Sequence, residues 1–283
     1  MFTLNVENAR GEILNLSNNI NYSIVGISGL NPPTAEMFTS SIVTSDGSVL
    51  NNTRIESRNL VLNIVLNGNI EASRINLYKY FRVKQKCKIY YKNGARDVYI
   101  EGYVESFEDD FFVQSQEVQI SVICYQPFFN AASELVVDLS LTLANFEFPF
   151  AIEEAGREFS QKINTYECLL VNEGEVDNGL IVELRATGTV INPIIYNEDN
   201  GEFFGLNYTL QDGDLITINT NVGEKAVTLT RDGVNSNLIN YLQQNSTWMK
   251  TVSGDNVFAF ACEGDTEDFL HVKFIHTSQY LGV

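Results

Sequence analysis

The stretch from Lys86 to Tyr125 has the clearest alternation of apolar and polar positions in the chain. A period of two is typical of a β-strand with one buried face. Asn93-Gly94 separates the first two runs, and this dipeptide favours a tight hairpin turn whose two central residues have positive φ. The acidic residues 108–110 form a turn before the next run, which ends at Pro127. The pattern predicts a β-meander as the core of the first half.

A helix is predicted just before this meander. Arg58 to Leu66 forms a strand-like run with at least one buried face, and Asn67-Gly68-Asn69 interrupts it. Asn69 can cap a helix over residues 70–83, because its side chain can accept a hydrogen bond from a free amide of the first turn. The apolar positions of this helix fall on one broad stripe: Ile75, Leu77, Tyr78 and Phe81. We expect this stripe to pack into the core.

Residues 31–52 differ in composition from their surroundings, because Pro, Ser, Thr, Asn and Gly replace the apolar runs. These residue types favour turns and loops. The segment is therefore predicted to be a long loop or a projecting hairpin. Loops of this length in compact domains usually contact something, so we expect a contact surface here.

The second half again consists of short apolar runs separated by turn signals such as Asp212-Gly213 and Asp232-Gly233. Many short strands with such turns predict a β-sandwich, with one short helix possible around residues 236–244. The fold class is therefore mainly β. The predicted domains are residues 1–130 and 146–283, with a linker over residues 131–145.

Charge separates the two halves. The chain has 18 Lys and Arg against 36 Asp and Glu, which gives a formal net charge of −18. Up to Phe128 the balance is 11 against 13, and beyond Phe128 it is 7 against 23. This acidic balance argues against unaided nucleic-acid binding, which needs clustered Lys and Arg. It fits either solubility or an acidic partner-binding surface.

The basic residues gather in one stretch, from Arg82 to Lys92. With a period of two, Lys84, Lys86 and Lys88 would share one face of an extended segment. Three interpretations are open: a solvated strand face, a contact with acidic residues of another subunit, or a lining that faces nucleic acid in transit.

The sequence offers little catalytic chemistry, and we assign no catalytic, cofactor-binding or metal-binding residue. His271 and His276 are an odd number of positions apart, so they face opposite sides of a regular strand and do not predict a metal site. Asp212-Gly213-Asp214 lacks the other ligands of a calcium loop and predicts a β-turn. Carboxylate groups such as Glu153-Glu154 leave a hydrolase open, since the sequence does not show whether two of them face each other across a cleft.

Two further patterns limit where the protein resides. The four cysteines, at positions 87, 124, 168 and 262, lie in apolar runs without CxxC spacing. This predicts buried thiols in a reducing compartment. The N-terminus lacks a signal peptide, and no apolar run reaches the length that spans a membrane. We therefore expect neither export by a signal peptide nor insertion in a membrane.

The order of several short motifs resembles the distal tail proteins of tailed bacteriophages, the siphovirus-type tail component family. In the first half the motifs are Gly29-Leu30-Asn31-Pro32-Pro33, Asp46-Gly47-Ser48, the run from Arg58 to Leu66, Gly102-Tyr103-Val104-Glu105 and Cys124-Tyr125-Gln126-Pro127-Phe128. In the second half they are Phe148-Pro149-Phe150, Val171-Asn172-Glu173-Gly174, Asn192-Pro193, Asp212-Gly213-Asp214 and Gly254-Asp255-Asn256. The resemblance covers nearly the whole chain, and residues 151–167 fit it least.

This resemblance implies a non-enzymatic structural protein of a phage virion or of a phage-tail-like particle, with a contractile or a non-contractile tail. Its first domain would form a ring, usually a homo-hexamer around a channel, and its second domain would be a galectin-like β-sandwich that projects outward. Such a ring is the baseplate hub, which joins the tail tube protein to the tail-tip or tail-associated lysin protein. Receptor-binding and tape-measure proteins are further expected partners, with DNA only in transit, no membrane, and synthesis in the bacterial host cytoplasm.

A carbohydrate-binding module is the alternative function. A galectin-like sandwich could hold a sugar on aromatic side chains of the second half, namely Tyr196, Phe203, Phe204, Tyr208 and Trp248. The sequence shows no group of His, Asn and Arg around Trp248, and such a group is typical of galectin-type sites. The structural role therefore remains the leading hypothesis.

Overall fold

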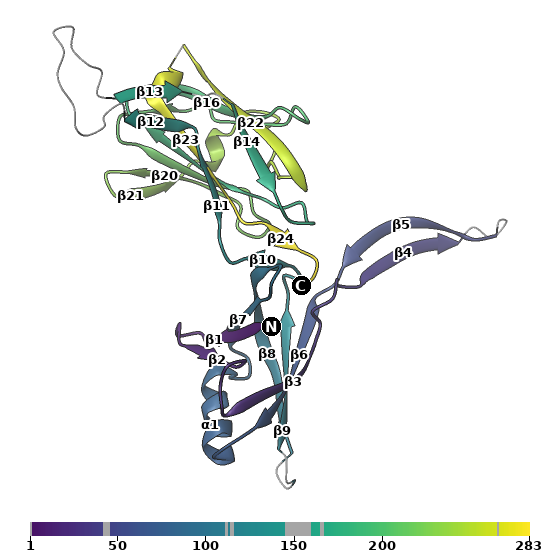
Figure 1. Cartoon of the computed structure of the whole chain (residues 1–283). Coiled ribbons are helices and arrows are strands. Elements are labelled where there is room, and N and C mark those ends of the chain that lie inside the picture. Colours follow the sequence, from purple (N-terminus) through teal and green to yellow (C-terminus); the bar gives the residue numbers. More distant parts are fainter. Residues whose placement is uncertain are drawn as a thin grey trace. The chain divides into compact units, whose positions relative to one another are not determined.

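The computed structural model describes residues 2–41, 46–110, 113, 116–144, 160–164, 167–264 and 266–283. The chain folds into two compact units, shown in Figure 1. The first unit comprises Met1–Ala132 with Gln279–Val283, and the second comprises Ser133–Ser278. In the described ranges no helix is both long and apolar enough to cross a membrane.

The first unit is built on an antiparallel nine-stranded sheet with the order β2-β1-β7-β8-β9-β6-β3, and β10 joins β8 to β24. Its strands are β1 (Thr3–Glu7), β2 (Ile13–Asn15), β3 (Tyr22–Ser28), β6 (Arg58–Leu66), β7 (Lys86–Lys92), β8 (Asp97–Asp109), β9 (Glu117–Cys124), β10 (Phe129–Ala131) and β24 (Gln279–Tyr280). Alternate residues of β6 are buried from Arg58 to Leu66. This burial confirms the strand that the sequence predicts there.

The predicted meander is present as β7, β8 and β9, but its turns differ from the expectation. Lys92 pairs with Asp97, so residues 93–96 form a four-residue loop and not a two-residue turn. The side-chain oxygen of Asn93 accepts hydrogen bonds from the amides of Ala95 and Arg96, at 2.8 and 2.7 Å. Side-chain capping of this kind replaces the positive φ values of a primed turn. The expected acidic turn is also displaced, because β8 continues through Asp109.

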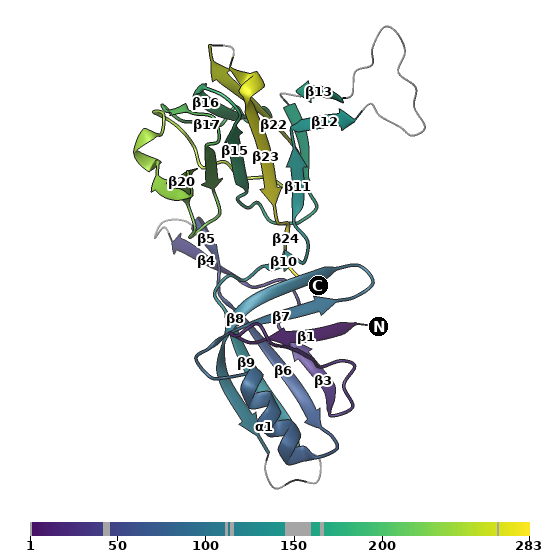
Figure 2. The same ribbon diagram turned by 90° about the vertical axis from the view of Figure 1, so that its left-hand side faces the viewer.

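The predicted helix is α1 (Ile70–Tyr80), which lies against the sheet near β6 (Figure 2). Asn69 caps it as predicted, since its side-chain oxygen accepts a hydrogen bond from the amide of Ala72 at 3.2 Å. The predicted apolar stripe is wrong in part: Leu77 and Phe81 are buried, whereas Ile75 and Tyr78 are exposed. Polar contacts decide which face of the helix is buried, and the periodicity of its apolar residues does not predict those contacts.

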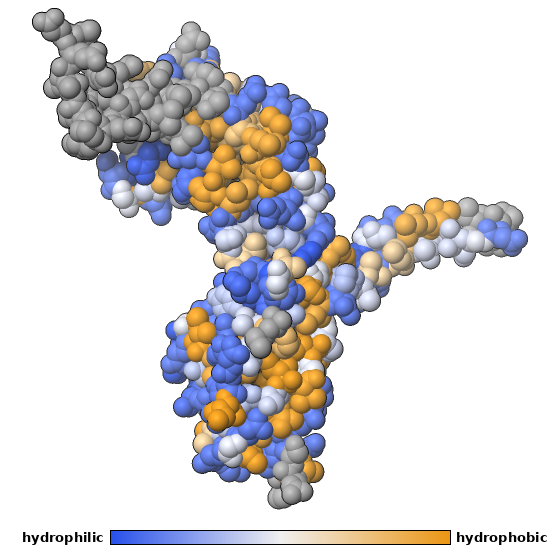
Figure 3. Space-filling view, in the orientation of Figure 1, coloured by the Kyte–Doolittle hydropathy of each residue, from blue (hydrophilic) through white to orange (hydrophobic). Residues whose placement is uncertain are grey.

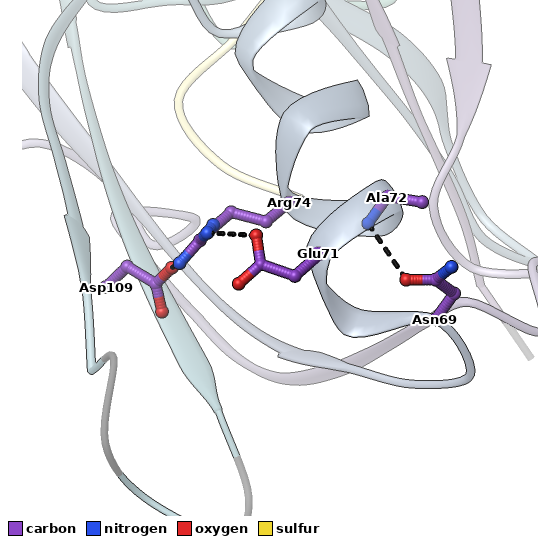
Figure 4. Close-up of polar contacts among 5 residues, drawn as sticks. All are labelled: Asn69, Glu71, Ala72, Arg74 and Asp109. Carbon is purple, nitrogen blue, oxygen red and sulfur yellow. Dashed lines mark hydrogen bonds and ion pairs between the residues drawn. The ribbon is translucent and has the colours of Figure 1, made fainter.

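Figure 4 shows the main polar contact of this helix. Arg74 is buried and pairs with Glu71 one turn earlier and with Asp109 of β8, the latter at 3.3 Å. The side chain of Asp109 is itself 2% exposed. A charge in such a place is stable only when a partner compensates it. The pair therefore fixes the rotation of α1 against the end of β8.

Residues 31–52 contribute to a two-stranded hairpin, β4 (Ala35–Ser41) and β5 (Ser48–Ile55). The two strands form a sheet of their own and pair only with each other among the described residues. The hairpin extends away from the main sheet of the first unit (Figure 1). Of the two predicted alternatives, a loop or a projecting hairpin, the structure contains the hairpin.

The second unit contains two larger antiparallel sheets and one short pair. The six-stranded sheet has β11 (Leu135–Asp138), β23 (Leu270–His276), β15 (Ile181–Ala186), β19 (Leu215–Asn219), β20 (Ala226–Arg231) and β21 (Val234–Asn237), in that order. The five-stranded sheet has β14 (Glu167–Asn172), β22 (Gly254–Glu263), β16 (Val190–Asn197) and β17 (Phe203–Gly205), with β18 (Thr209–Leu210) on β16. The short pair is β12 (Ser140–Ala144) with β13 (Ser160–Asn164). Two 3-10 turns are η1 (Ile239–Tyr241) and η2 (Glu267–Phe269).

One hydrophobic core joins the two larger sheets. Phe258 of β22 and Phe274 of β23 are fully buried, and their ring centroids are 5.2 Å apart. Side chains from two sheets that share one core define a β-sandwich. The sandwich is thus confirmed, while the helix predicted around residues 236–244 is reduced to η1.

Strand pairing between distant residues assigns two short segments, β11 and β24, to units that local sequence patterns do not indicate. β11 lies in the range expected as a linker, and it pairs with β23 of the second unit. β24 lies at the far end of the chain, and it pairs with β10 of the first unit. Both segments are short, and their positions follow from long-range pairing.

Candidate functional site

The hairpin of β4 and β5 is almost entirely exposed. All eight residues of β5 are exposed, and so are six of the seven in β4. Five large apolar side chains lie open on it, with exposed fractions of 59% for Met37, 41% for Phe38, 51% for Val49, 56% for Leu50 and 38% for Ile55. An isolated two-stranded hairpin is marginal in water. These side chains therefore favour a partner surface.

Strand register divides the hairpin into two faces, and Figure 3 shows apolar side chains along it. One face carries Met37, Leu50 and Ile55. The other carries Phe38 and Val49 together with an exposed ion pair in which Arg54 lies 3.0 Å from Glu36. A surface ion pair of this kind contributes little stability. Its charges leave the first face as the more apolar of the two.

Arg58, the first residue of β6, holds the base of this hairpin. Its side chain is buried, and it donates to four backbone carbonyls: Gly29 at 2.5 Å, Asn31 at 2.8 Å, Pro127 at 2.7 Å and Leu281 at 2.6 Å. Its guanidinium also lies over the Phe129 ring, 4.6 Å from the ring centroid. Burial lowers the pKa of Arg58 from its ordinary value.

This arrangement suits arginine alone, because five donors in a planar fork can satisfy several carbonyls at once. The four acceptors come from three distant stretches of the chain. Arg58 therefore joins the segment before the hairpin to the end of β9 and to the end of the chain. Local sequence patterns do not reveal this role of Arg58, and the one signal for it is an arginine at the start of a buried apolar strand.

Residues 279–283 complete the same cluster. The amide of Val283 donates to the carbonyl of Leu30 at 3.1 Å. Arg96 donates to the carbonyl of Gly282 at 2.7 Å and lies over the Tyr280 ring, 4.3 Å from its centroid. A Cβ atom at Gly282 would lie 2.9 Å from the Leu30 oxygen. We call Arg58, its four acceptors and residues 279–283 the hairpin anchor.

The basic stretch pairs mainly within its own sheet. Lys86 lies 2.6 Å from Glu101, and Lys92 lies 2.6 Å from Asp97. Lys88 lies over the Tyr99 ring, 3.7 Å from its centroid. Lys84 precedes β7 and has positive φ, so it does not continue the strand face. These contacts favour the solvated strand face over a lining for nucleic acid.

Asp214 and His276, two further candidate residues from the sequence, are buried and make contacts that stabilise the fold. Asp214 is buried and accepts two hydrogen bonds from Arg231, at 2.7 and 2.5 Å, and this pairing holds the pKa of the carboxyl below its usual range. His276 is buried beside the Thr251 hydroxyl, and burial lowers its pKa. Glu153-Glu154 lies outside the described residues. Among the described residues no three His, Cys, Asp or Glu side chains form a group that could hold a metal ion.

All four cysteines are free thiols. Cys87 and Cys124 are buried, while Cys168 and Cys262 are half-buried. Burial raises the pKa of Cys87 to about 12 and that of Cys168 to about 11. A thiol with a raised pKa carries little thiolate and is a poor nucleophile.

The aromatic residues considered for sugar binding divide into two groups. Phe204 is fully buried, and Trp248 packs against it with ring centroids 5.3 Å apart. Tyr208 is partly buried against the same core. Tyr196 and Phe203 lie outside that core, on paired strands, with centroids 6.5 Å apart. The structure thus separates these two residues from the rest of the expected set.

Comparison with known proteins gives the family. The phage tail protein RIFT-related domain matches residues 10–124, and the C-terminal domain of the siphovirus-type tail component matches residues 173–280. No curated protein sequence matches the chain significantly. The two domain matches together span most of the chain and keep the order expected for this family.

Solved structures share the fold. The crystal structure of SPP1 Dit (gp 19.1), described as a paradigm of the hub adsorption apparatus of phages that infect Gram-positive bacteria, has a TM-score of 0.70. It is 11% identical, and the alignment covers 99% of both chains. A component of the phage P2 baseplate in its activated conformation with calcium has a TM-score of 0.51 at 8% identity, over 98% of both chains.

The chain therefore belongs to the siphovirus-type phage tail proteins. Within that family it is a distal tail protein, a structural component of the phage tail.

Proposed function

We propose that this chain forms the hub of a phage baseplate, in which six copies close into a ring through their first units. The ring joins the tail tube protein to the tail-tip or tail-associated lysin protein and carries receptor-binding proteins. The tape-measure protein is a further partner, and DNA passes the ring only in transit through the channel. The protein is made in the host cytoplasm, acts in the virion and catalyses no reaction.

The exposed hairpin is the observation that carries this proposal. Its apolar side chains have no core of their own, while the hairpin anchor holds its base through a buried arginine. Hydrophobic side chains on a fixed, projecting element favour a protein contact. In the proposed ring, each hairpin packs on the first unit of the next copy.

The experiment is light scattering behind size exclusion, at several protein and salt concentrations. We expect a mass about six times the 31.8 kDa of one chain for the unchanged protein. The double variant Met37→Ser with Leu50→Ser should shift the mass toward one chain, because it removes apolar area from one hairpin face. Its far-UV circular dichroism should not change, since both side chains are exposed.

The matched control is Val222→Ser with Val234→Ser, two exposed apolar residues of the second unit. This variant should assemble like the unchanged protein. A mass unaffected by the hairpin variant contradicts the proposed contact. A stable mass at another multiple of the chain contradicts the six-copy ring.

A further inference from the structure

An open groove with a volume of about 530 Å³ lies on the five-stranded sheet of the second unit. Its floor includes Ile194 of β16 and Ala261 of β22, which are directly paired. Its polar lining comprises Asn192, Asn207, Gln243, Gln244 and Glu263, and Tyr196 adds an aromatic side chain. Figure 3 shows the apolar surface over the neighbouring β14 and β22. We call this hollow the amide groove.

A β-bulge shapes one end of the amide groove. The pairing of β16 with β22 shifts between Ile191 and Ile194, and Asn192 within this shift has a φ of +46°. Its side-chain amide donates to the Glu263 carboxylate at 2.5 Å. Bulges and left-handed residues redirect side chains and are concentrated at functional sites. Here the bulge places an amide and a carboxylate side by side.

A glycine and two exposed amide side chains shape the rest of the groove. Gly205 of β17 pairs with Ile194, and a Cβ atom at Gly205 would lie 2.5 Å from the Gln243 side-chain oxygen. The missing side chain lets Gln243 lie close over the sheet. Asn207 and Gln244 are exposed, and their amides can both donate and accept hydrogen bonds.

We propose that the amide groove binds a neutral oligosaccharide. Sugar hydroxyls need partners that donate and accept at close spacing, which the amides and the Glu263 carboxylate provide. The apolar C–H face of a sugar ring can pack on an aromatic side chain, which Tyr196 provides. Small-ligand sites combine apolar surface with polar groups that orient the ligand, and here Ile194, Ala261 and Tyr196 supply the apolar part.

Charge selects against anionic ligands. Among the described residues that line the groove there is no Lys or Arg, and Glu263 is acidic. The sequence beyond Phe128 has 7 basic against 23 acidic residues, so the field of the second unit also repels anions. Phosphate-rich or uronate-rich polymers are therefore poor ligands.

Strand pairing also disfavours an extended peptide. A peptide that adds to a sheet needs a free strand edge with unpaired backbone groups. The groove lies over β16 and β22, and each of these strands is paired on both sides. Recognition must therefore come from side chains on the face of the sheet.

The test uses the full chain on an array of neutral and anionic oligosaccharides, followed by calorimetry on the strongest neutral one. We expect a dissociation constant of about 0.1–1 mM for so open a site. Tyr196→Ala and the isosteric Glu263→Gln should each weaken binding about tenfold. Asn207→Ala combined with Gln244→Ala should give a similar loss, because it removes two amides from the lining. Both side chains are exposed, so we expect the double variant to fold normally.

Tyr125→Ala is the control, because Tyr125 is an exposed tyrosine of the first unit. It should leave sugar affinity unchanged. The inference is overturned if no neutral oligosaccharide binds at 10 mM or if only anionic ones do. It is also overturned if Tyr196→Ala and Glu263→Gln both bind the oligosaccharide with the affinity of the unchanged protein. Sugar binding goes beyond the proposed hub function. Light scattering tests ring assembly and calorimetry tests sugar binding, so failure of one proposal can be distinguished from failure of the other.

Discussion

The two units use a buried arginine contact in different ways. In the first unit, Arg58 is buried, and its hydrogen-bond partners in the described chain are four backbone carbonyls from distant segments. In the second unit, the half-exposed Arg231 pairs with the buried carboxylate of Asp214, 17 positions away. The first arrangement adds side-chain hydrogen bonds at the point where the ladders β3–β6, β6–β9 and β10–β24 end. The second neutralises one buried charge inside a sandwich that already has its own core.

This difference indicates where each unit is vulnerable. The second unit depends on a continuous hydrophobic core, with its ion pair as an addition. The first unit has a core beneath its main sheet, but the base of its hairpin depends on a few polar contacts. Polar contacts at a buried place are costly to break, because the remaining partners lose their hydrogen bonds.

Loss of the Arg58 guanidinium should have the largest effect. We expect Arg58→Met to lower the free energy of unfolding of the first unit by about 3–5 kcal/mol, because four carbonyls lose a charged donor. Arg58→Lys should recover only part of this loss, since an ammonium lacks the planar fork. Urea unfolding followed by far-UV circular dichroism measures the change.

Urea unfolding of Arg58→Met can also show whether the effect of this substitution is confined to the first unit. Trp248 is the one tryptophan of the chain and lies in the second unit, so its fluorescence reports that unit. Its unfolding midpoint should stay in place in Arg58→Met. An equal shift of both signals would show that the two units unfold together and that the anchor is not local.

Asp214→Asn should have the next largest effect. We expect a loss of about 2 kcal/mol in the second unit, because Arg231 loses a charge-assisted pair. The folded state lowers the pKa of Asp214, so this stabilisation is present above the unfolded pKa. It then decreases as pH falls through the folded value.

The advantage of the unchanged protein over Asp214→Asn should therefore shrink below about pH 4. Trp248 fluorescence during urea unfolding at pH 3 and at pH 6 checks this expectation. A difference independent of pH would assign the loss to packing and not to the ion pair.

Gly282→Ala should weaken the hairpin anchor more mildly. The new methyl group would lie 2.9 Å from the Leu30 oxygen and 3.1 Å from the Pro32 nitrogen. Overpacking of this kind costs about 1–3 kcal/mol. Gly94→Ala is the matched control, because a Cβ atom there meets nothing within 4 Å. Equal stability of the two variants in urea would contradict the close packing at Gly282.

Lys86→Ala should have the smallest effect. Lys86 and Glu101 lie 2.6 Å apart, but both are substantially exposed, so the stability change should stay within about 0.5 kcal/mol. Thermal unfolding checks this value. If the variant keeps its stability but loses the assembled mass, the basic stretch contacts another subunit and the alternative left open by the sequence is restored.

The local sequence pattern determined most of the secondary structure of this protein. Alternation predicted β6, the meander and the strands of the sandwich, because a period of two with turn residues between runs is a local signal. Asn69 and its helix were predictable for the same reason. The order of short motifs was enough to indicate the phage tail family.

Tertiary structure alone decided the hairpin anchor and the amide groove. The partners of Arg58 lie near positions 30, 127 and 281, and their meeting depends on β24 pairing with β10. The amide groove depends on a bulge at Asn192 and on residues from β16, β22 and the η1 region. The sequence determines which residues favour strands, turns and burial, because these are local preferences. Which distant polar groups meet depends on long-range packing, and only the folded chain specifies it.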